Sequence, residues 1–166
     1  MRRRFTISAI TALTMMAVMS AVFAGPSLKP AQGAKQISGI GYFDTTGECD
    51  DPEGVGASYA LTMTGSLTGC HYVFVGDHKC QPGGAYYETG TETFVGWYNG
   101  QYGTFTTNYV FTAKYVDCSL TTEVEGRCQH PFTGGSGVFE GVKEARLDMR
   151  DDVSAGNFPY KGHIQF

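Results

Sequence analysis

The sequence predicts an all-β domain, folded as an eight-stranded antiparallel barrel of the up-and-down type. Apolar and polar residues alternate over several segments, which indicates strands with one buried face, and no segment after residue 24 keeps a helical period. The chain has 23 glycines, 13% aromatic residues and only 17% charged residues, as in domains with many strands and turns. A barrel is favoured over a sandwich because closure removes the edges that glycine-rich strands would expose.

The first 24 residues have the pattern of a secretory signal peptide. Three arginines precede an apolar run that ends in small residues, and we expect cleavage after Ala24. Residues 25–35 contain two prolines and are expected to form a flexible leader, and residues 36–166 a single barrel domain. We therefore expect a secreted or periplasmic protein, with no membrane span after cleavage of the signal.

The charge of the chain argues against anionic partners. The formal net charge is -4, and removal of the signal takes away three of the 12 basic residues and none of the 16 acidic ones, which leaves -7. We therefore expect no binding to nucleic acid or to an anionic membrane surface.

The first expected strands lie before residue 76. Residues 36–44 predict a short strand, and an acidic loop follows at residues 45–56. Its carboxylates do not have EF-hand spacing, so a solvated turn is favoured over a calcium site. Residues 58–75 alternate clearly and are expected to bulge or bend at Gly65 or Gly69.

The next expected strand, at residues 85–97, carries two glutamates. Glu88 and Glu92 share a face with Tyr86 and Phe94. If this face points inward, both carboxylates line a cavity and are candidates for catalysis, because burial raises the pKa of a carboxylate. The cost of burying an unpaired charge favours the alternative, in which both face solvent.

An aromatic stripe follows the hairpin turn that the Asn-Gly pair at residues 99–100 predicts. The strand expected at residues 103–116 places four aromatic rings on one face: Phe105, Tyr109, Phe111 and Tyr115. Such a stripe is more often core than pocket, but in a small closed barrel the two are continuous. Phe105, Phe111 and Tyr115 are therefore candidate ligand-binding residues, and Tyr109 is a third candidate for catalysis.

The last part of the chain completes the expected barrel. Residues 117–131 alternate with a polar face, which holds Glu123 and Glu125 and is expected to point outward. Residues 133–149 begin as a glycine-rich corner and continue as a two-faced strand, and residues 158–166 alternate again to the end of the chain.

Five cysteines accompany the predicted export, which makes disulfides the default. Cys70/Cys80 and Cys118/Cys128 share a separation of ten residues across expected hairpins. We therefore predict these two bridges and a free Cys49.

No metal ion or cofactor is predicted. His78-x-Cys80 and Cys128-x-His130 offer the ligand types of a zinc site, but disulfides are favoured in an exported protein. The chain has no nucleophile elbow, zinc-protease, phosphate-loop or dinucleotide motif, so hydrolysis by a known triad is unsupported.

Residues 133–141, TGGSGVFEG, are the most specific motif of the chain, and Phe139 within them is expected to plug the barrel. This motif resembles the corresponding corner of plant allene oxide cyclases, whose barrel superfamily includes the dirigent proteins. A weaker similarity extends over residues 88–109. The resemblance implies a calycin-like barrel of the allene oxide cyclase type, in families that commonly form trimers and handle apolar, oxygenated small molecules.

The activity of that family is cyclisation of an unsaturated fatty-acid epoxide inside the barrel, without a cofactor. By the resemblance, Cys70 corresponds to a cysteine of the cyclase and is a candidate ligand-binding residue, while Tyr109 lies near a cavity tyrosine. The acidic segment that binds the epoxide-associated water in those enzymes has no counterpart at residues 41–54, and a Cys70–Cys80 bridge would remove the thiol.

These observations predict an exported barrel that binds a small hydrophobic or phenolic molecule. Two alternatives remain open. One is a cofactor-independent cyclase or isomerase in which Glu88, Glu92 or Tyr109 assists. The other is a structural barrel whose lumen is filled by its own aromatic side chains. A homotrimer is implied by analogy alone.

Overall fold

The computed structural model describes residues 33–51 and 54–166. The predicted signal peptide and all but the last three residues of the predicted leader lie outside the described residues. Within the described ranges, no helix is long and apolar enough to cross a membrane.

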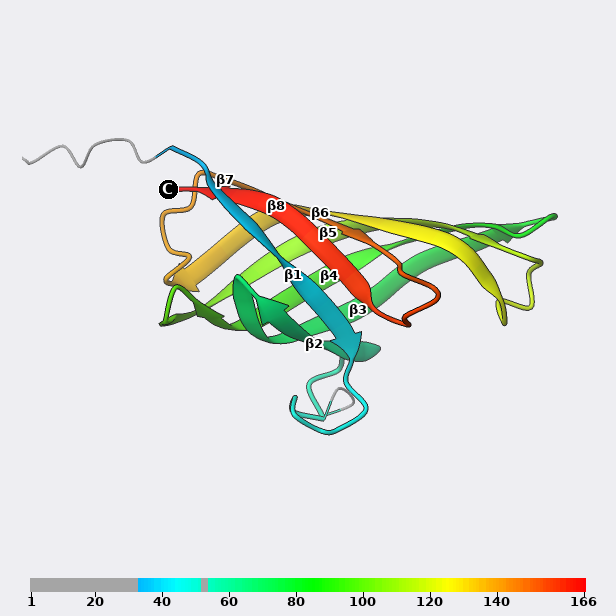
Figure 1. Cartoon of the computed structure of the whole chain (residues 1–166), viewed down its shortest axis with the longest axis horizontal. Helices are drawn as coiled ribbons and strands as arrows, with labels where there is room; N and C mark the ends of the chain where they lie inside the picture. Colours follow the sequence, from blue (N-terminus) through cyan, green and yellow to red (C-terminus); the bar gives the residue numbers. More distant parts are fainter. Residues whose placement is uncertain (1–32, 52–53) are drawn as a thin grey trace, which may run out of the picture. The chain divides into compact units, whose positions relative to one another are not determined.

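Eight strands follow one another in the described part of the chain. They are β1 (Lys35–Phe43), β2 (Tyr59–Gly65), β3 (Leu67–Gln81), β4 (Ala85–Tyr98), β5 (Gln101–Tyr115), β6 (Glu123–Gly137), β7 (Glu144–Arg150) and β8 (Phe158–Gln165). Each strand pairs with the next, and β8 pairs antiparallel with β1, so that the sheet closes (Figure 1). The predicted fold class, an eight-stranded antiparallel barrel, is confirmed.

One predicted turn is confirmed, and one predicted strand is divided. The single bent strand expected over residues 58–75 is instead two antiparallel strands, β2 and β3, because the chain reverses at Gly65, where φ is 94°. The Asn-Gly pair joins β4 to β5, with positive φ at both Asn99 (51°) and Gly100 (74°), as the commonest two-residue hairpin turn requires.

Strands β3 to β6 are about twice as long as the other four and continue past them (Figure 1). The pairing of β2 with β3 ends at Val73, and that of β7 with β6 ends at Arg127. Beyond these points β3 to β6 form a four-stranded extension, residues 74–91 and 108–126. One end of the barrel therefore opens onto this extension.

The opposite end of the barrel is closed by aromatic rings. Phe139, in the connection between β6 and β7, is 1% exposed and lies edge-on to Phe105 at a centroid distance of 4.9 Å. A Cβ atom on Gly135 would lie 2.7 Å from the Cβ of Phe139, so the close approach of this ring requires glycine. Phe139 thus fills this end of the barrel, as predicted.

The two disulfides differ from the predicted pairs. Cys49 is bonded to Cys70 and Cys80 to Cys118, while Cys128 remains a free thiol. The prediction of a Cys70–Cys80 bridge was wrong because both residues lie on the single strand β3, where ten residues span roughly 33 Å. The equal separation of ten residues therefore had no structural meaning.

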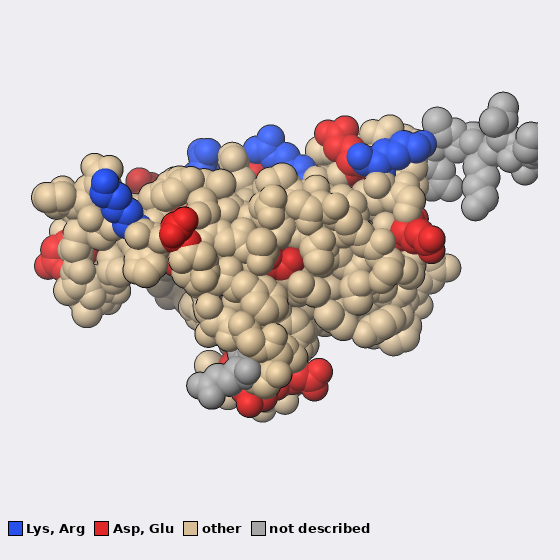
Figure 2. All heavy atoms as spheres, turned by 180° about the vertical axis from the view of Figure 1, so that it is seen from behind, with Lys and Arg blue, Asp and Glu red and all other residues tan. Residues whose placement is uncertain are grey.

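One face of the molecule carries few charges (Figure 2). On the face seen in Figure 2, lysine and arginine side chains gather along one edge and acidic groups are scattered over an otherwise uncharged surface. Hydroxyl pairs link β5 to β6 on the outside, with Thr104 2.7 Å from Ser136 and Thr106 2.8 Å from Thr133. Neighbouring strands are thus joined there by neutral hydrogen bonds between side chains.

Candidate functional site

The barrel encloses a cavity of about 470 Å³ that opens toward the extension, a volume in the range of small-molecule sites. All eight strands contribute to its wall. Its aromatic lining residues are Phe43, Tyr59, Tyr86, Tyr109, Phe111, Tyr115 and Phe158. The alternative of a lumen completely filled by its own side chains is therefore wrong.

Strand β4 points both of its glutamates into the barrel. Glu88 and Glu92 line the cavity, and Glu92 is only 3% exposed. The alternative that the sequence favoured, with both carboxylates in solvent, is thus wrong. The physical reason is that each carboxylate has partners on neighbouring strands, which offset the cost of its burial.

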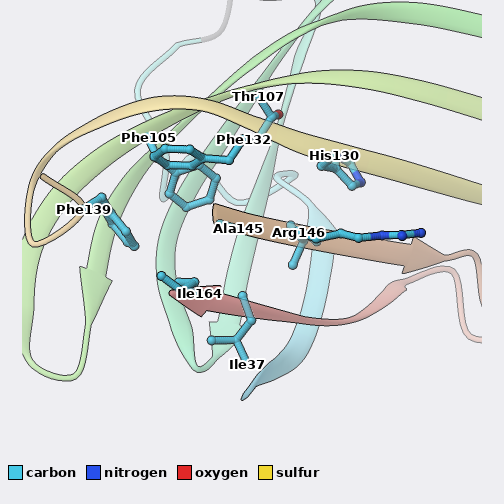
Figure 3. Close-up of a pocket in the computed structure, with 10 residues that line it drawn as sticks. Ile37, Phe105, Thr107, His130, Phe132, Phe139, Ala145, Arg146 and Ile164 are labelled. Carbon is cyan, nitrogen blue, oxygen red and sulfur yellow. The ribbon is translucent and has the colours of Figure 1, made fainter. Parts of the chain in front are cut away.

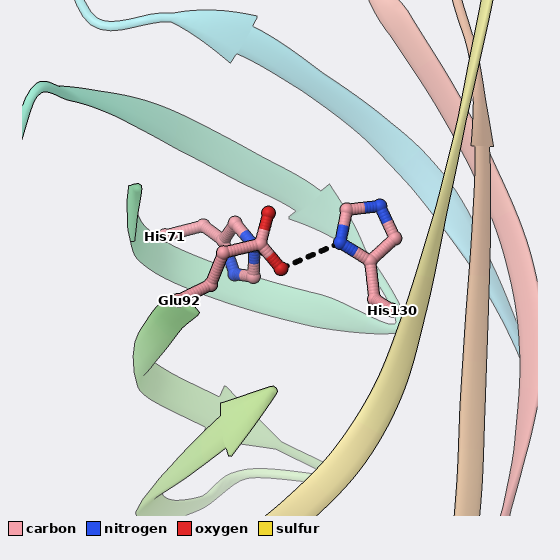
Figure 4. A group of neighbouring side chains, drawn as sticks. All are labelled: His71, Glu92 and His130. Atoms are coloured by element: carbon pink, nitrogen blue, oxygen red, sulfur yellow. Dashed lines mark hydrogen bonds and ion pairs between the residues drawn. The ribbon is translucent and has the colours of Figure 1, made fainter. Parts of the chain in front are cut away.

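Glu92 lies between two buried histidines at the floor of the cavity (Figure 4). Nδ1 of His130, on β6, donates to Oε2 of Glu92 over 2.6 Å, and Nε2 of His71, on β3, lies 3.3 Å from the same oxygen. The hydroxyl of Thr107, directly opposite on β5, donates to this oxygen as well. Burial alone would raise the pKa of Glu92, but the charges of the two histidines hold it below its ordinary value. Glu92 is therefore a buried carboxylate anion.

Glu88 precedes Glu92 by four residues on β4, toward the open end, and accepts two phenolic hydrogen bonds. The hydroxyl of Tyr109 donates to its Oε1 over 2.7 Å, and that of Tyr86 to its Oε2 over 2.6 Å. Burial, with the hydrogen bond to Glu88, raises the pKa of both tyrosines, so both phenols stay protonated. Glu88, Tyr86 and Tyr109 together form a fixed polar group on an aromatic wall.

A second acidic pair lies nearer the opening. Asp151, just after β7, and Glu123, at the start of β6, both line the cavity. Burial, and after it the hydrogen bond and charge of Glu123, together raise the pKa of Asp151 to about 8. Glu123 was expected on the outer face; a register shift beside Tyr115 turns it inward.

A much smaller cavity, of about 20 Å³, lies toward the closed end and has room for about one water molecule (Figure 3). Phe105 and Thr107 line this space, whereas His130 lines both cavities and stands between them. Phe105 belongs to the buried core and does not line the large cavity. Its predicted contact with a ligand there is not supported, because the wall that it faces is already filled by Phe94 and Phe139.

Cys70 and Cys128 differ from their predicted roles at the cavity. Cys70 is bonded to Cys49 and packs with Tyr72 in a separate small cluster, so it neither lines the large cavity nor offers a thiol. Cys128, predicted to be bridged, lines the large cavity as a thiol, and burial raises its pKa. The other predicted ligand-binding residues, Phe111 and Tyr115, do line it.

Sequence reasoning overlooked His71, and it considered His130 only beside Cys128. His71 follows Gly69 and precedes Val73 on the inward face of β3, so it is a polar residue in an otherwise apolar row. That pattern was the available signal. The pattern did not identify the carboxylate that contacts His71, because Glu92 lies on β4 and reaches His71 only through the pairing of β3 with β4.

Comparisons of the chain with protein-family models, with curated proteins and with solved structures find no match.

Proposed function

We propose that this protein is an exported barrel that binds a small hydrophobic or phenolic molecule in its large cavity. The observation that carries the proposal is the cavity wall: aromatic rings surround a volume of about 470 Å³, and Glu88, held by two of them, is among its carboxylates. Apolar surface supplies the free energy of binding, and a few placed polar groups orient the ligand.

Glu88 is the group that would recognise a ligand hydroxyl. Its two oxygens each accept one phenolic hydrogen bond, and an ionised carboxylate can accept about four. A phenolic ligand would donate a further charge-assisted hydrogen bond to Glu88 while its ring packs against Tyr59 or Phe111.

Export is supported by the two disulfides, which are compatible with an oxidising compartment. The pattern of the first 24 residues supports a secreted or periplasmic location. The resemblance of residues 133–141 to allene oxide cyclases agrees with a ligand-holding barrel, and it stays a prediction.

The test is calorimetric titration of the purified protein with 1-naphthol and, as a matched ligand without the hydroxyl, naphthalene. We expect saturable binding of one 1-naphthol. Cys128→Phe, which adds a ring inside the cavity, should weaken it at least about tenfold, the effect of about 1.4 kcal/mol. Arg127→Phe, exposed at the neighbouring position of β6, is the control and should bind as the wild type does.

A second variant tests the hydrogen bond from the ligand to Glu88 separately from the apolar contacts of the cavity. Glu88→Gln should weaken 1-naphthol more than naphthalene, because only the naphthol can donate to the carboxylate. If neither compound binds, or if Cys128→Phe and Arg127→Phe bind 1-naphthol equally, the proposal is wrong. Native mass spectrometry of protein from its original host would then identify any retained molecule.

We propose a cofactor-independent isomerase or cyclase as the second candidate function. Asp151 favours it, because a carboxyl with a pKa near 8 inside a cavity can both give and accept a proton near neutral pH. Glu88 and Tyr109 would orient the substrate. The test is incubation of the retained molecule in D₂O: wild type should incorporate deuterium or rearrange it, and Asp151→Asn should not. An unchanged molecule would exclude this candidate.

A further inference from the structure

The floor of the cavity gathers three side chains that can each bind a metal ion. His71 on β3, Glu92 on β4 and His130 on β6 are all buried, and one donor atom from each lies within 4.8 Å of the others (Figure 4). Two imidazoles and one carboxylate are the donor set of many zinc and non-haem iron centres that keep an open coordination position.

The hydrogen bonds of this group are incomplete. Among the described residues, neither ring nitrogen of His71 has a hydrogen-bond partner, and neither does Nε2 of His130, although all three atoms are buried. Of these three atoms, Nε2 of His71 lies beside Glu92, at 3.3 Å from its Oε2, and buried polar atoms are nearly always paired, so this nitrogen indicates a missing partner. A cation would accept the lone pairs of both imidazoles and also supply the positive charge that a buried carboxylate needs.

We propose that His71, Glu92 and His130 bind one divalent transition-metal ion, with zinc as the ion that best fits the donors. Bonds of about 2.1 Å to a tetrahedral zinc place two donor atoms roughly 3.4 Å apart. Nε2 of His71 and Oε2 of Glu92 are already 3.3 Å apart. Nδ1 of His130 is closer to that oxygen, at 2.6 Å, and moves away by roughly 0.8 Å as the ion enters.

The neighbours of the three ligands suit an ion at this place. The hydroxyl of Thr107 donates to Oε2 of Glu92, and this hydrogen bond would fix the orientation of the carboxylate that binds the ion. Glu92 and His130 line the large cavity, whereas His71 is 0% exposed and does not. The free coordination position of the ion therefore faces the cavity, where a water or an oxygen atom of a bound molecule can occupy it.

This metal site goes beyond the proposed ligand binding and does not depend on it, because the ion needs no organic molecule. The sequence predicted no metal, and its candidate zinc ligands included His78. In the structure His78 is exposed on the extension and lies beside Tyr86, on the part of β3 that has no β2 partner. His78 and His163 are therefore matched controls for His71 and His130.

The test uses protein purified without a polyhistidine tag, stripped with a chelator and titrated with ZnCl₂ and with CoCl₂. We expect one equivalent of each metal to bind, Co²⁺ to give the visible absorption of a low-coordinate centre, and Zn²⁺ to raise the melting temperature. His71→Ala, Glu92→Gln and His130→Ala should each weaken Zn²⁺ binding at least about tenfold, the loss that even an outer-shell change causes. His78→Ala and His163→Ala should bind Zn²⁺ as the wild type does.

Histidine ¹⁵N spectra of the wild type make the result independent of the folding of any variant. Zn²⁺ should shift the resonances of His71 and His130 and leave those of His78 and His163 in place. If the two buried histidines do not respond to one equivalent of Zn²⁺, or if binding is lost in His78→Ala, the metal proposal is overturned. The three residues would then be a hydrogen-bonded group without a metal, and the cavity proposal would be unaffected.

Discussion

Glu88 and Glu92 occupy alternate inward positions of β4, yet they meet different surroundings. Glu92 contacts two imidazoles, and it is the more deeply buried of the two. Glu88 contacts two phenols, which are neutral donors. The difference follows from the depth in the barrel: a fully buried carboxylate needs opposite charge, while a half-buried one is satisfied by hydroxyl groups.

Asp151 makes the stability of the fold depend on pH. Its pKa is raised from the ordinary value of 3.8 to about 8, first by burial and then by Glu123. The folded protein therefore keeps a proton that the unfolded chain releases between about pH 4 and about pH 8. The stability that this group contributes is complete below about pH 4 and is lost as the pH rises through about 8.

We expect Asp151→Asn to remove this dependence, since an amide does not titrate. The free energy of unfolding of the wild type, measured by urea denaturation at several pH values, should fall relative to the variant between pH 4 and pH 8. Asp148→Asn, on the neighbouring strand β7, is the control and should keep the wild-type slope. Equal slopes for wild type and Asp151→Asn would contradict the raised pKa.

The extension of β3 to β6 forms the outer part of the cavity. The shorter strands β2 and β7 do not pair with it. Tyr86, Phe111, Tyr115 and Glu123 reach the cavity from it. The disulfide between Cys80, at the end of β3, and Cys118, in the connection from β5 to β6, joins its two hairpins. The bond therefore holds together strands that no barrel closure constrains.

Removal of this bond should loosen the extension and the cavity together. We expect Cys80→Ser/Cys118→Ser to lower the free energy of unfolding by about 2–4 kcal/mol and to weaken 1-naphthol binding. Cys49→Ser/Cys70→Ser, which releases the loop before β2, is the matched control: it should cost stability and leave binding unchanged. Thiol titration of the unreduced, denatured wild type should find one thiol, Cys128, and a second thiol would contradict the pairing.

Closure of the whole barrel depends on the meeting of β1 with β8, the strands furthest apart in the sequence. Tyr160 of β8 lies across Gly39 of β1, where a Cβ atom would be 2.5 Å from the tyrosine hydroxyl. That hydroxyl accepts from the N–H of Leu67 and donates to the carbonyl of Thr64, both at 2.9 Å. One side chain thus connects the last strand, across the first, to the turn between β2 and β3.

Tyr160→Phe tests this connection, because it keeps the ring and removes the hydroxyl. The N–H of Leu67, a residue that is 0% exposed, then loses its partner, so we expect a loss of about 1–3 kcal/mol in the free energy of unfolding. Tyr102→Phe, at a ring that is 53% exposed on β5, is the control and should change it by less than about 0.5 kcal/mol. Equal losses in the two variants, measured by urea denaturation, would exclude this role for Tyr160.

Much of this architecture was predictable from local patterns. A strand turns successive side chains to opposite faces, so the alternation along β4 and β5 correctly grouped Glu88 with Glu92 and Tyr109 with Phe111. The Asn-Gly turn has a conformation that its own two residues favour. These predictions needed only neighbours in the sequence, and for that reason they were confirmed.

The site depended on contacts between strands that are distant in the sequence. Alternation does not tell which face of a strand points inward, and the cost of unpaired charge favoured the wrong face for Glu92 while its partner His130, 38 residues later, was unknown. The cysteine pairs failed for the same reason, since Cys70 and Cys80 share one continuous strand.

By itself, the sequence determined the closed all-β architecture, its Asn-Gly turn and the sets of side chains that share a face, because the backbone imposes a period of two along every strand. The tertiary structure alone decided which face is inside, which cysteines are bonded, and that Glu92 meets His71 and His130 at the floor of a cavity. The register between paired strands controls those contacts, and it is set by the packing of the whole barrel.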